Sequence, residues 1–300
     1  MPEAGHAATH SHSAGVKTYQ ALLLACLLPR HEAWPLLEAA SGRSREFMIA
    51  HGQEPADSAA CALFERMTTM RQQGMPIAYL TGWREFYGRP FWVNRHTLIP
   101  RIDTELLIDT VLSTVGQKDG PIRLCDLGTG SGCIAITLAL ELKQAQITAT
   151  DASAKALEMA RNNAAWLGVG PRIAMRCGRW FDALAGFEQR FHGLISNPPY
   201  VAASDPHLQA GDLRFEPRQA LTPMRAVDEI GLPDPGLSDI ADIAQGAPQW
   251  LEPGGFLLVE HGSEQQDAVI RLLAEAGFGA VRGLSDQAGL PRAVIGFRLG

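Results

Sequence analysis

The pattern of apolar and polar positions divides the chain into two parts that differ in periodicity. From Tyr19 to about Gln72, apolar residues recur every three or four positions, which is the spacing of helices that bury one face. Pro35 is tolerated best in a first helical turn, so the second helix is expected to begin close to it. Asp57 or Ser58 is expected to cap the last helix. The pattern predicts a small helical domain over residues 17–75, which has no residue of catalytic type and is expected to dock a partner.

Residues 76–97 differ in texture, because aromatic and polar side chains alternate around a Gly-Arg-Pro turn. Such alternation predicts a β-hairpin linker. Beyond it, a helix to about Leu112 is expected, capped by Asp103 or Thr104. Apolar runs of strand length follow near residues 122–127, 146–150, 172–177, 193–196, 254–260, 280–284 and 292–298. Six or seven strands that alternate with helices predict one doubly wound α/β domain over residues 98–300.

Composition narrows the class of protein. The chain has 300 residues, of which 46% are hydrophobic and 19% charged, as in an ordinary globular protein. Its net charge of −6 disfavours extended contact with nucleic acid and favours a protein or small-molecule substrate. Residues 1–16 contain His6, His10 and His12 but no apolar segment, so a disordered leader is expected rather than a signal peptide or a metal site. We therefore expect a cytoplasmic protein without membrane contact.

The cysteines indicate neither a disulfide framework nor a metal centre. Their number is odd, and none of them stands in a C-x-x-C spacing. Buried thiols are expected at all five positions, which are Cys26, Cys61, Cys125, Cys133 and Cys177. No metal site is predicted.

A glycine-rich turn lies between the first apolar strand of the second domain and the helix that follows. Glycines let the backbone approach a ligand closely, and a helix N-terminus offers free N–H groups. The dinucleotide pattern G-x-G-x-x-G would need glycine or alanine where Cys133 stands, and Asp126 beside the turn would repel a pyrophosphate. The spacing D-x-G-x-G-x-G instead favours S-adenosylmethionine, and the turn residues are Gly128, Thr129, Gly130, Ser131 and Gly132.

Two further positions favour a nucleoside-containing cofactor. Asp151 ends the second strand, nineteen residues after Gly132, where a carboxylate can accept hydrogen bonds from both ribose hydroxyls. The alternative role of Asp151 is N-cap of the helix over residues 153–167. Trp180 and Phe181 follow the third strand and could flank an adenine ring. For Phe181, packing in the core is a nearly equal alternative.

The loop from Asn197 to Tyr200 suits a substrate NH2 group. Two consecutive prolines stiffen it and leave mainly carbonyl acceptors, so the Asn197 side-chain oxygen and the Pro198 carbonyl could hold both amino protons. Tyr200 would cover one face of the planar group, although a simple Pro-Pro turn that ends a strand is the alternative. Because open α/β sheets bind ligands at the carboxyl ends of their strands, we expect this loop to share a cleft with the glycine-rich turn. Residues 205–217 are expected to form a lid or substrate wall, and His261 to be structural rather than a base.

In combination these motifs resemble those of the N5-glutamine methyltransferases that modify peptide chain release factors. The resemblance covers residues 17–300 and rests on Pro76 with Tyr79–Gly82 and Glu85-Phe86, Leu98–Arg101 with Asp103–Glu105, Asp126–Gly132, and Asn197–Tyr200. Residues 205–217 are closer to the release-factor branch than to the branch that modifies a ribosomal protein. The chain departs from the family pattern at Ile102, where proline is usual, and at residues 229–235, which form a longer segment.

The resemblance implies a fold, a cofactor and a partner. The fold is a Rossmann-like class I methyltransferase domain, with a seven-stranded, mostly parallel sheet preceded by a helical domain and a hairpin linker. The cofactor is S-adenosylmethionine, with S-adenosylhomocysteine as product, and the substrate is the glutamine of the Gly-Gly-Gln motif in class 1 release factors. Cofactor contacts are implied at Gly128–Gly132, Asp151, Trp180 and Asn197, and substrate contacts at Asn197, Pro198, Pro199 and Tyr200. Catalysis is expected from Asn197, Pro198 and Tyr200.

Three other functions fit part of the pattern. An amino-methyltransferase acting on adenine could use the same Asn197 loop, but the negative net charge disfavours it. A glutamine methyltransferase of a ribosomal protein would share the chemistry. A dehydrogenase, or a cofactor-binding module without catalysis, is the remaining alternative, and Cys133 weakens the dehydrogenase.

Overall fold

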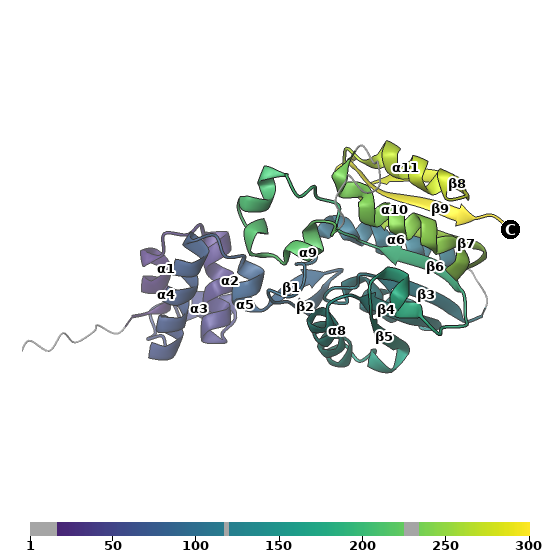
Figure 1. Cartoon of the computed structure of the whole chain (residues 1–300). Coiled ribbons are helices and arrows are strands. Elements are labelled where there is room, and N and C mark those ends of the chain that lie inside the picture. The colour runs from purple at the N-terminus through teal and green to yellow at the C-terminus, as the bar shows by residue number, and fades with distance from the viewer. Residues whose placement is uncertain (1–16, 117–119, 225–233) are drawn as a thin grey trace, which may run out of the picture. The chain divides into compact units, whose positions relative to one another are not determined.

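The structure is a computed structural model that describes residues 17–116, 120–224 and 234–300 (Figure 1). The predicted leader and most of the 229–235 segment lie outside the described residues. The described chain forms two compact units, one ending at Thr81 and one beginning at Gly82. From the sequence the helical domain was expected to end six residues earlier, at residue 75.

The first unit contains helices only. Their bounds are α1 Tyr19–Ala25, α2 Arg30–Ser41, α3 Arg45–Ala50, α4 Ser58–Gln72 and α5 Ile77–Thr81. The Asp57 carboxylate caps α4 by accepting hydrogen bonds from the backbone N–H groups of Ala59 and Ala60. Helix α5 corrects the expectation that residues 76–81 belong to the hairpin. Pro76 opens this helix, since its carbonyl accepts hydrogen bonds from Tyr79 and Leu80.

Helix α2 begins earlier than its proline predicts. Pro35 lies inside the helix, five residues after Arg30, and not in its first turn. A proline there removes one backbone hydrogen bond. The side chains of Ala33, Leu36 and Leu37 are fully buried on either side of it, so tertiary packing offsets that local loss.

The hairpin opens the second unit. Strands β1 Trp83–Phe86 and β2 Arg89–Trp92 pair antiparallel, with Phe86 opposite Arg89. The buried rings of Phe86 and Phe91 meet edge to face with centroids 6.0 Å apart. Both phenylalanines belong to the same core as helices α6 and α7, so the hairpin is packed onto the α/β domain.

The α/β domain is built on a seven-stranded sheet, as predicted. The strands are β3 Ile122–Leu127, β4 Ala145–Asp151, β5 Ile173–Cys177, β6 Phe191–Ser196, β7 Leu251–Glu260, β8 Phe278–Ser285 and β9 Pro291–Arg298. Their order is β5-β4-β3-β6-β7-β9-β8, and β9 alone runs opposite to the other six strands. The expected doubly wound, mostly parallel sheet is therefore confirmed.

Helices cover both faces of this sheet (Figure 1). Residues of α6 Glu105–Val115, α7 Cys133–Glu141 and α8 Ala154–Trp166 belong to one core, and residues of α10 Ser238–Gly246 and α11 Gln266–Glu275 to the other. Strand β7 supplies both cores, because Phe256 and Leu258 point to the first and Leu257 and Val259 to the second. This explains why the strand is apolar without interruption.

Two expectations about this domain need correction. The sequence pattern predicts one helix from Leu237 to Trp250, but α10 ends at Gly246 and is followed by a 3₁₀ turn, Ala247–Trp250, which contains Pro248. Of the five cysteines only Cys125 and Cys133 are buried, and Cys177 is exposed. All five are free thiols, and every helix within the described ranges is too short or too polar to cross a bilayer.

The strand order determines where a ligand can bind. Strand β3 lies between β4 and β6, so the chain moves one way along the sheet after β3 and returns to its other side with β6. At such a switch point the loops that leave the strands diverge and open a crevice. The loop after β3 is the glycine-rich turn, and the loop after β6 begins with Asn197.

Candidate active site

A pocket opens at this switch point, and most of the predicted site residues line it. From the sequence-based set, the lining contains Gly128, Thr129, Gly130, Ser131, Asp151, Trp180, Asn197 and Pro199. Gly132, Pro198 and Tyr200 are not among the lining residues. The two loops that were expected to share a cleft are therefore brought together in one pocket.

The glycine-rich turn is held in shape by the buried carboxylate of Asp126. Its Oδ2 atom accepts a hydrogen bond from the Thr129 hydroxyl at 2.6 Å and from the backbone N–H of Ala135, in α7, at 3.2 Å. Burial raises the pKa of Asp126 to about 7 although these two bonds lower it. Asp126 is thus a clamp between the turn and its helix, and its charge lies behind the pocket.

Two glycines of the turn are required for different reasons. At Gly128, where φ is +78°, a Cβ atom would lie 3.1 Å from the Trp180 ring in the pocket. At Gly132, where φ is +85°, a Cβ atom would lie 2.7 Å from Ile136 and 3.1 Å from Ala160. Gly128 therefore keeps the pocket surface flat, whereas Gly132 lets α7 and α8 approach each other.

Asp151 ties the turn to the next strand. Its Oδ2 atom accepts a hydrogen bond from the Gly130 N–H at 2.9 Å, and its Oδ1 atom accepts one from the Ser153 N–H at 2.8 Å. Burial raises its pKa, while these bonds lower it. The alternative role as helix cap is wrong, because the Ser153 hydroxyl caps α8 by accepting from Ala156. Each carboxylate oxygen keeps a lone pair for a ligand hydroxyl.

Trp180 is held in the pocket by an unusual backbone and by neighbours that the sequence did not reveal. Its φ angle is +42°, a region that bulky residues rarely adopt. The indole N–H lies 3.4 Å from Oδ1 of Asp239, which also accepts a hydrogen bond from Arg179 at 2.6 Å. Phe181, in contrast, stacks on Trp250 within the core, at 6.3 Å between ring centroids.

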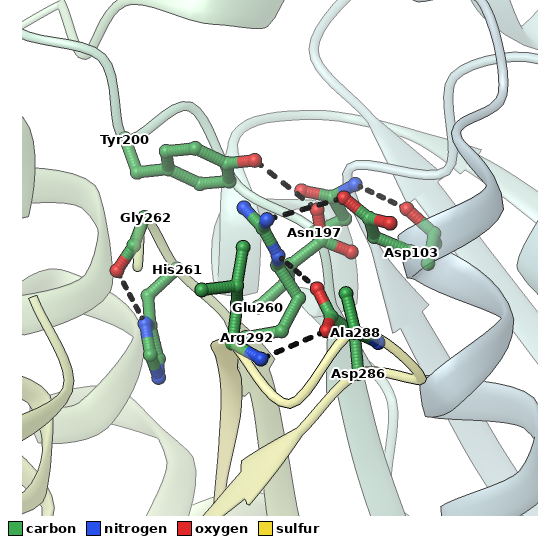
Figure 2. A network of polar contacts seen from close by, with 11 residues as sticks. Asp103, Asn197, Tyr200, Glu260, His261, Gly262, Asp286, Ala288 and Arg292 are labelled. Carbon is green, nitrogen blue, oxygen red and sulfur yellow. Dashed lines mark hydrogen bonds and ion pairs between the residues drawn. The ribbon is translucent and has the colours of Figure 1, made fainter. Parts of the chain in front are cut away.

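Asn197 is oriented by a residue from a distant part of the chain. Its side-chain Nδ2 donates a hydrogen bond to the Thr104 hydroxyl at 3.1 Å, shown as a dashed line in Figure 2. The carboxamide oxygen has no hydrogen-bond partner among the described residues. Thr104 does not cap α6 with its side chain, contrary to expectation. The carbonyl oxygen of Asn197 is therefore left as an acceptor beside the glycine-rich turn.

Tyr200 contacts the protein and not the pocket. Its hydroxyl donates a hydrogen bond to Oε1 of Glu260 at 3.2 Å (Figure 2). Its ring packs against the core on the α10 face. The predicted role over a substrate amide is not evident in this arrangement. His261 is fully buried, and its Nδ1 atom lies 2.8 Å from the Gly262 carbonyl, so it has no place in the pocket either.

One wall of the pocket joins two segments that are far apart in sequence. The buried Glu216 accepts hydrogen bonds from the backbone N–H of Ile99, at 3.0 Å, and from the Arg101 side chain. Sequence reasoning named residues 205–217 as a wall but missed this anchor, as it missed Thr104, Asp239 and Glu260. Nothing in the local pattern distinguishes these side chains from ordinary surface groups.

Comparison with known proteins identifies domains that are similar to both units of the chain. Two family models match the chain: "PrmC N-terminal domain" over residues 17–82 and "Methyltransferase small domain" over residues 101–218. A solved S-adenosylmethionine-dependent methyltransferase from Agrobacterium tumefaciens has the same fold, with a TM-score of 0.50, 16% identity, and coverage of 72% of this chain and 69% of that one. The expected methyltransferase fold, preceded by a helical domain, is confirmed.

Curated relatives are much closer in sequence. The release factor glutamine methyltransferase of Bordetella pertussis is 45% identical over 90% of this chain and 95% of that protein. The enzyme of the same name from Neisseria gonorrhoeae is 45% identical over 90% of this chain and 93% of its own length. Similarity at this level covers both the helical unit and the α/β domain. The chain therefore belongs to the release factor glutamine methyltransferase family.

Proposed function

We propose that this protein transfers the methyl group of S-adenosylmethionine to the side-chain amide nitrogen, N5, of the glutamine in the Gly-Gly-Gln motif of a peptide chain release factor. One observation carries the proposal. The glycine-rich turn and the Asn197 loop line the same pocket, and Asn197 Nδ2 donates its hydrogen bond to the Thr104 hydroxyl, so that the carboxamide oxygen stays available. The turn that would hold the methyl donor and the acceptor that would hold the substrate amide thus line one pocket.

The residues of the cradle fit S-adenosylmethionine better than a dinucleotide. Gly128 and Gly130, both with positive φ, bring bare backbone to the pocket surface. Asp151 offers carboxylate lone pairs to ribose hydroxyls, and Trp180 offers an aromatic face. The carboxylates of Asp126 and Asp151 beside the turn would oppose a pyrophosphate, whereas a cationic sulfonium and an ammonium group tolerate them.

The Asn197 loop is suited to activating the weakly nucleophilic amide nitrogen of a glutamine side chain. An amide nitrogen is a poor nucleophile because its lone pair is delocalised into the carbonyl. When bound, S-adenosylmethionine supplies an electrophilic methyl group. Asn197 Oδ1 and the Pro198 carbonyl would hold the two N–H bonds of the glutamine and direct the nitrogen lone pair toward that methyl. Orientation of this kind contributes on the order of 7 kcal/mol in favourable cases. After transfer, the N-methylated amide cation would be acidic enough to lose its surplus proton to water or to a carbonyl oxygen, so no strong base is needed.

Tyr200 has a supporting role in this proposal. Its hydroxyl on Glu260 and its packed ring fix the end of the Asn-Pro-Pro segment, so the two acceptors keep their spacing. Pro198 contributes its backbone carbonyl, and Pro199 lines the pocket. The acceptor pair is thereby built on a segment whose φ angles the proline rings restrict.

The helical unit is proposed to dock the release factor. It carries large apolar side chains in exposed positions, with Leu24 68%, Leu27 87% and Ile49 63% accessible. Leu24 and Ile49 line a surface pocket of this unit. Exposed apolar groups that gather around a pocket are typical of protein-binding surfaces. Replacing both residues by serine should raise the KM for the release factor and leave the KM for the cofactor unchanged.

A substrate panel tests the proposal directly. The purified protein is incubated with methyl-labelled S-adenosylmethionine and, separately, a release factor, a ribosomal protein and DNA. Peptide mapping should place one methyl group on the glutamine of the Gly-Gly-Gln motif, and a release factor with that glutamine replaced by alanine should take up none. Labelling only of the ribosomal protein or of adenine would contradict the proposal, and labelling of nothing would favour a module that binds without catalysis.

A further inference from the structure

A carboxylate from helix α10 reaches the pocket and has an oxygen that the contacts described so far leave unused. Asp239 lies in the first turn of α10, is 2% exposed and lines the pocket together with Arg179 and Trp180. Its Oδ1 atom accepts hydrogen bonds from Arg179, at 2.6 Å, and from the Trp180 indole N–H, at 3.4 Å. Its Oδ2 atom has no hydrogen-bond partner among the described residues. Because a nearly buried carboxylate oxygen without a partner costs stability, we expect a ligand group to donate to it.

The Trp180 indole extends from the glycine-rich turn to this carboxylate. At one edge of the ring, Cζ3 and Cη2 lie 3.1 and 3.5 Å from the point that a Cβ atom on Gly128 would occupy. At another edge, Nε1 donates its hydrogen bond to Asp239. An indole N–H points outward in the plane of the ring, so the carboxylate lies beside the rim of the indole and not over its face. A planar base stacked on Trp180 would therefore have its own edge next to Asp239.

The chemistry of the cofactor limits which donor can reach this oxygen. S-adenosylmethionine carries three kinds of hydrogen-bond donor, which are the ribose hydroxyls, the ammonium group of the methionine part and the 6-amino group of adenine. Asp151 is the proposed acceptor for the hydroxyls. The ammonium group is remote from the base, whereas the 6-amino group lies in the plane of adenine and at its edge. The amino group is thus the donor that stacking on Trp180 would bring to Asp239.

We propose that Asp239 selects adenine as the base of the cofactor, with Oδ2 accepting a hydrogen bond from the 6-amino group while the ring stacks on Trp180. The inference rests on the proposed function, because it concerns the base of S-adenosylmethionine. A carboxylate can only accept, so a purine with a carbonyl oxygen at position 6 would place two acceptors against each other. A site that leaves its own polar group unpaired with the wrong ligand discriminates against that ligand.

The two bonds to Oδ1 make the Asp239→Asn variant informative. Arg179 and Trp180 can only donate hydrogen bonds, so the carboxamide of the variant must keep its oxygen toward them. Its NH2 group then takes the place of Oδ2. The substitution therefore replaces an acceptor by a donor without a change in shape, and it should reverse the preference for the group at position 6.

Calorimetry on the full-length protein tests this with three ligands. They are S-adenosylhomocysteine, S-inosylhomocysteine, in which an oxygen replaces the 6-amino group, and the analogue with hydrogen at that position. The wild type should bind S-adenosylhomocysteine about 10- to 100-fold more tightly than the hydrogen analogue, which lacks only the donor. In Asp239→Asn this ratio should fall to about one. The variant should also bind S-inosylhomocysteine more tightly than the wild type does.

Asp242→Asn is the matched control. Oδ2 of Asp242 accepts a hydrogen bond from the same Arg179 side chain at 2.8 Å, but Asp242 is not among the residues that line the pocket. The variant thus makes the same chemical change beside the same arginine. It should keep the wild-type preference among the three ligands. Circular dichroism confirms that both variants are folded.

Three outcomes would overturn the inference. If Asp239→Asn weakened all three ligands equally, Asp239 would act only by holding Arg179 and Trp180. If Asp242→Asn lost the preference as well, the selection would belong to Arg179. Equal binding of S-adenosylhomocysteine and the hydrogen analogue by the wild type would exclude any contact with the amino group, and this measurement needs no variant to fold.

Failure of the proposed function gives different results. A wild type that binds none of the three ligands would contradict the cofactor itself. A wild type that shows the preference but leaves release-factor glutamine unmodified would contradict the proposed substrate, and the contact between Asp239 and adenine would stand.

Discussion

The two loops that form the pocket are stabilised in opposite ways. The glycine-rich turn is held by Asp126 and Asp151, each of which bonds to groups within twenty-one residues of itself. The Asn197 loop is held by Thr104 and Glu260, which are 93 residues upstream of Asn197 and 60 residues downstream of Tyr200. One loop is organised by neighbours in sequence and the other by neighbours in space.

Because of this difference, we expect that cofactor affinity and turnover can be changed independently by substitution. Changes around the turn should alter cofactor affinity and stability, because its clamps also hold β3, β4 and α7 together. Changes behind the Asn197 loop should alter turnover, because Thr104 accepts the hydrogen bond from Asn197 Nδ2 and Glu260 accepts the one from the Tyr200 hydroxyl. Four variants test this division.

The largest effect is expected from Asn197→Ala. It removes the side-chain acceptor for the substrate amide and should lower kcat by about 10²- to 10³-fold, the cost of losing one preorganised polar group at a reacting centre. Cofactor affinity should change little, because the glycine-rich turn is untouched. Steady-state kinetics on the release factor and calorimetry with S-adenosylmethionine measure the two quantities. Asn162→Ala, at an exposed position, is the control. An unchanged kcat would remove Asn197 from the mechanism.

Asp126→Asn should change the pH dependence of stability. The folded-state pKa of Asp126, about 7, lies above its ordinary value of 3.8, so the folded protein binds a proton more tightly than the unfolded chain does. Its contribution to the free energy of unfolding is present below about pH 4 and is lost as pH rises toward 7, by on the order of 4 kcal/mol. Urea unfolding should show that the free energy of unfolding of the variant, relative to that of the wild type, is higher at pH 8 than at pH 4.5. Parallel pH profiles would contradict this.

Asp151→Ala should weaken cofactor binding. It removes a charged acceptor in the pocket and the bond that holds the Gly130 N–H, so the loss is about 1.5–3 kcal/mol, or roughly 10- to 100-fold in Kd. At saturating cofactor, kcat should stay near that of the wild type. Calorimetry measures the affinity, with the exposed Asp182→Ala as control. Equal affinity in both variants would exclude Asp151 from the cofactor site.

The smallest effect is expected from Asn163→Ala, which connects the hairpin to the glycine-rich turn. The buried Asn163 side chain bonds to both backbone groups of Trp92, at 2.8 and 3.0 Å, and to the Ser131 carbonyl at 2.8 Å. Leaving such groups unpaired costs about 1–3 kcal/mol of unfolding free energy. Chemical denaturation should show this loss, and the neighbouring, exposed Asn162→Ala should show none. If the two variants were equally stable, Asn163 would not join the hairpin to the turn.

Most of the fold could be predicted because its signals are local. Each strand of the sheet is a short apolar run, and β3 with its glycine-rich turn and α7 is contiguous in the chain. The errors arose where packing overrides a local preference. Pro35 lies within α2 because fully buried neighbours offset its missing hydrogen bond. Thr104 does not cap α6 with its side chain, because its hydroxyl accepts the hydrogen bond from Asn197 instead.

By itself the sequence determined the class of fold, the glycine-rich turn and the loop that carries the proposed amide acceptor, Asn197. These follow from periodicity, from backbone freedom at glycine and from stiffness at proline, which are properties of adjacent residues. Only the tertiary structure decided which way the Asn197 carboxamide points and which residues support Trp180 and the pocket wall. These features depend on Thr104, Asp239 and Glu216, whose hydrogen-bond partners lie 59 to 117 residues away in the chain, and a hydrogen bond between distant side chains leaves no trace in the local pattern.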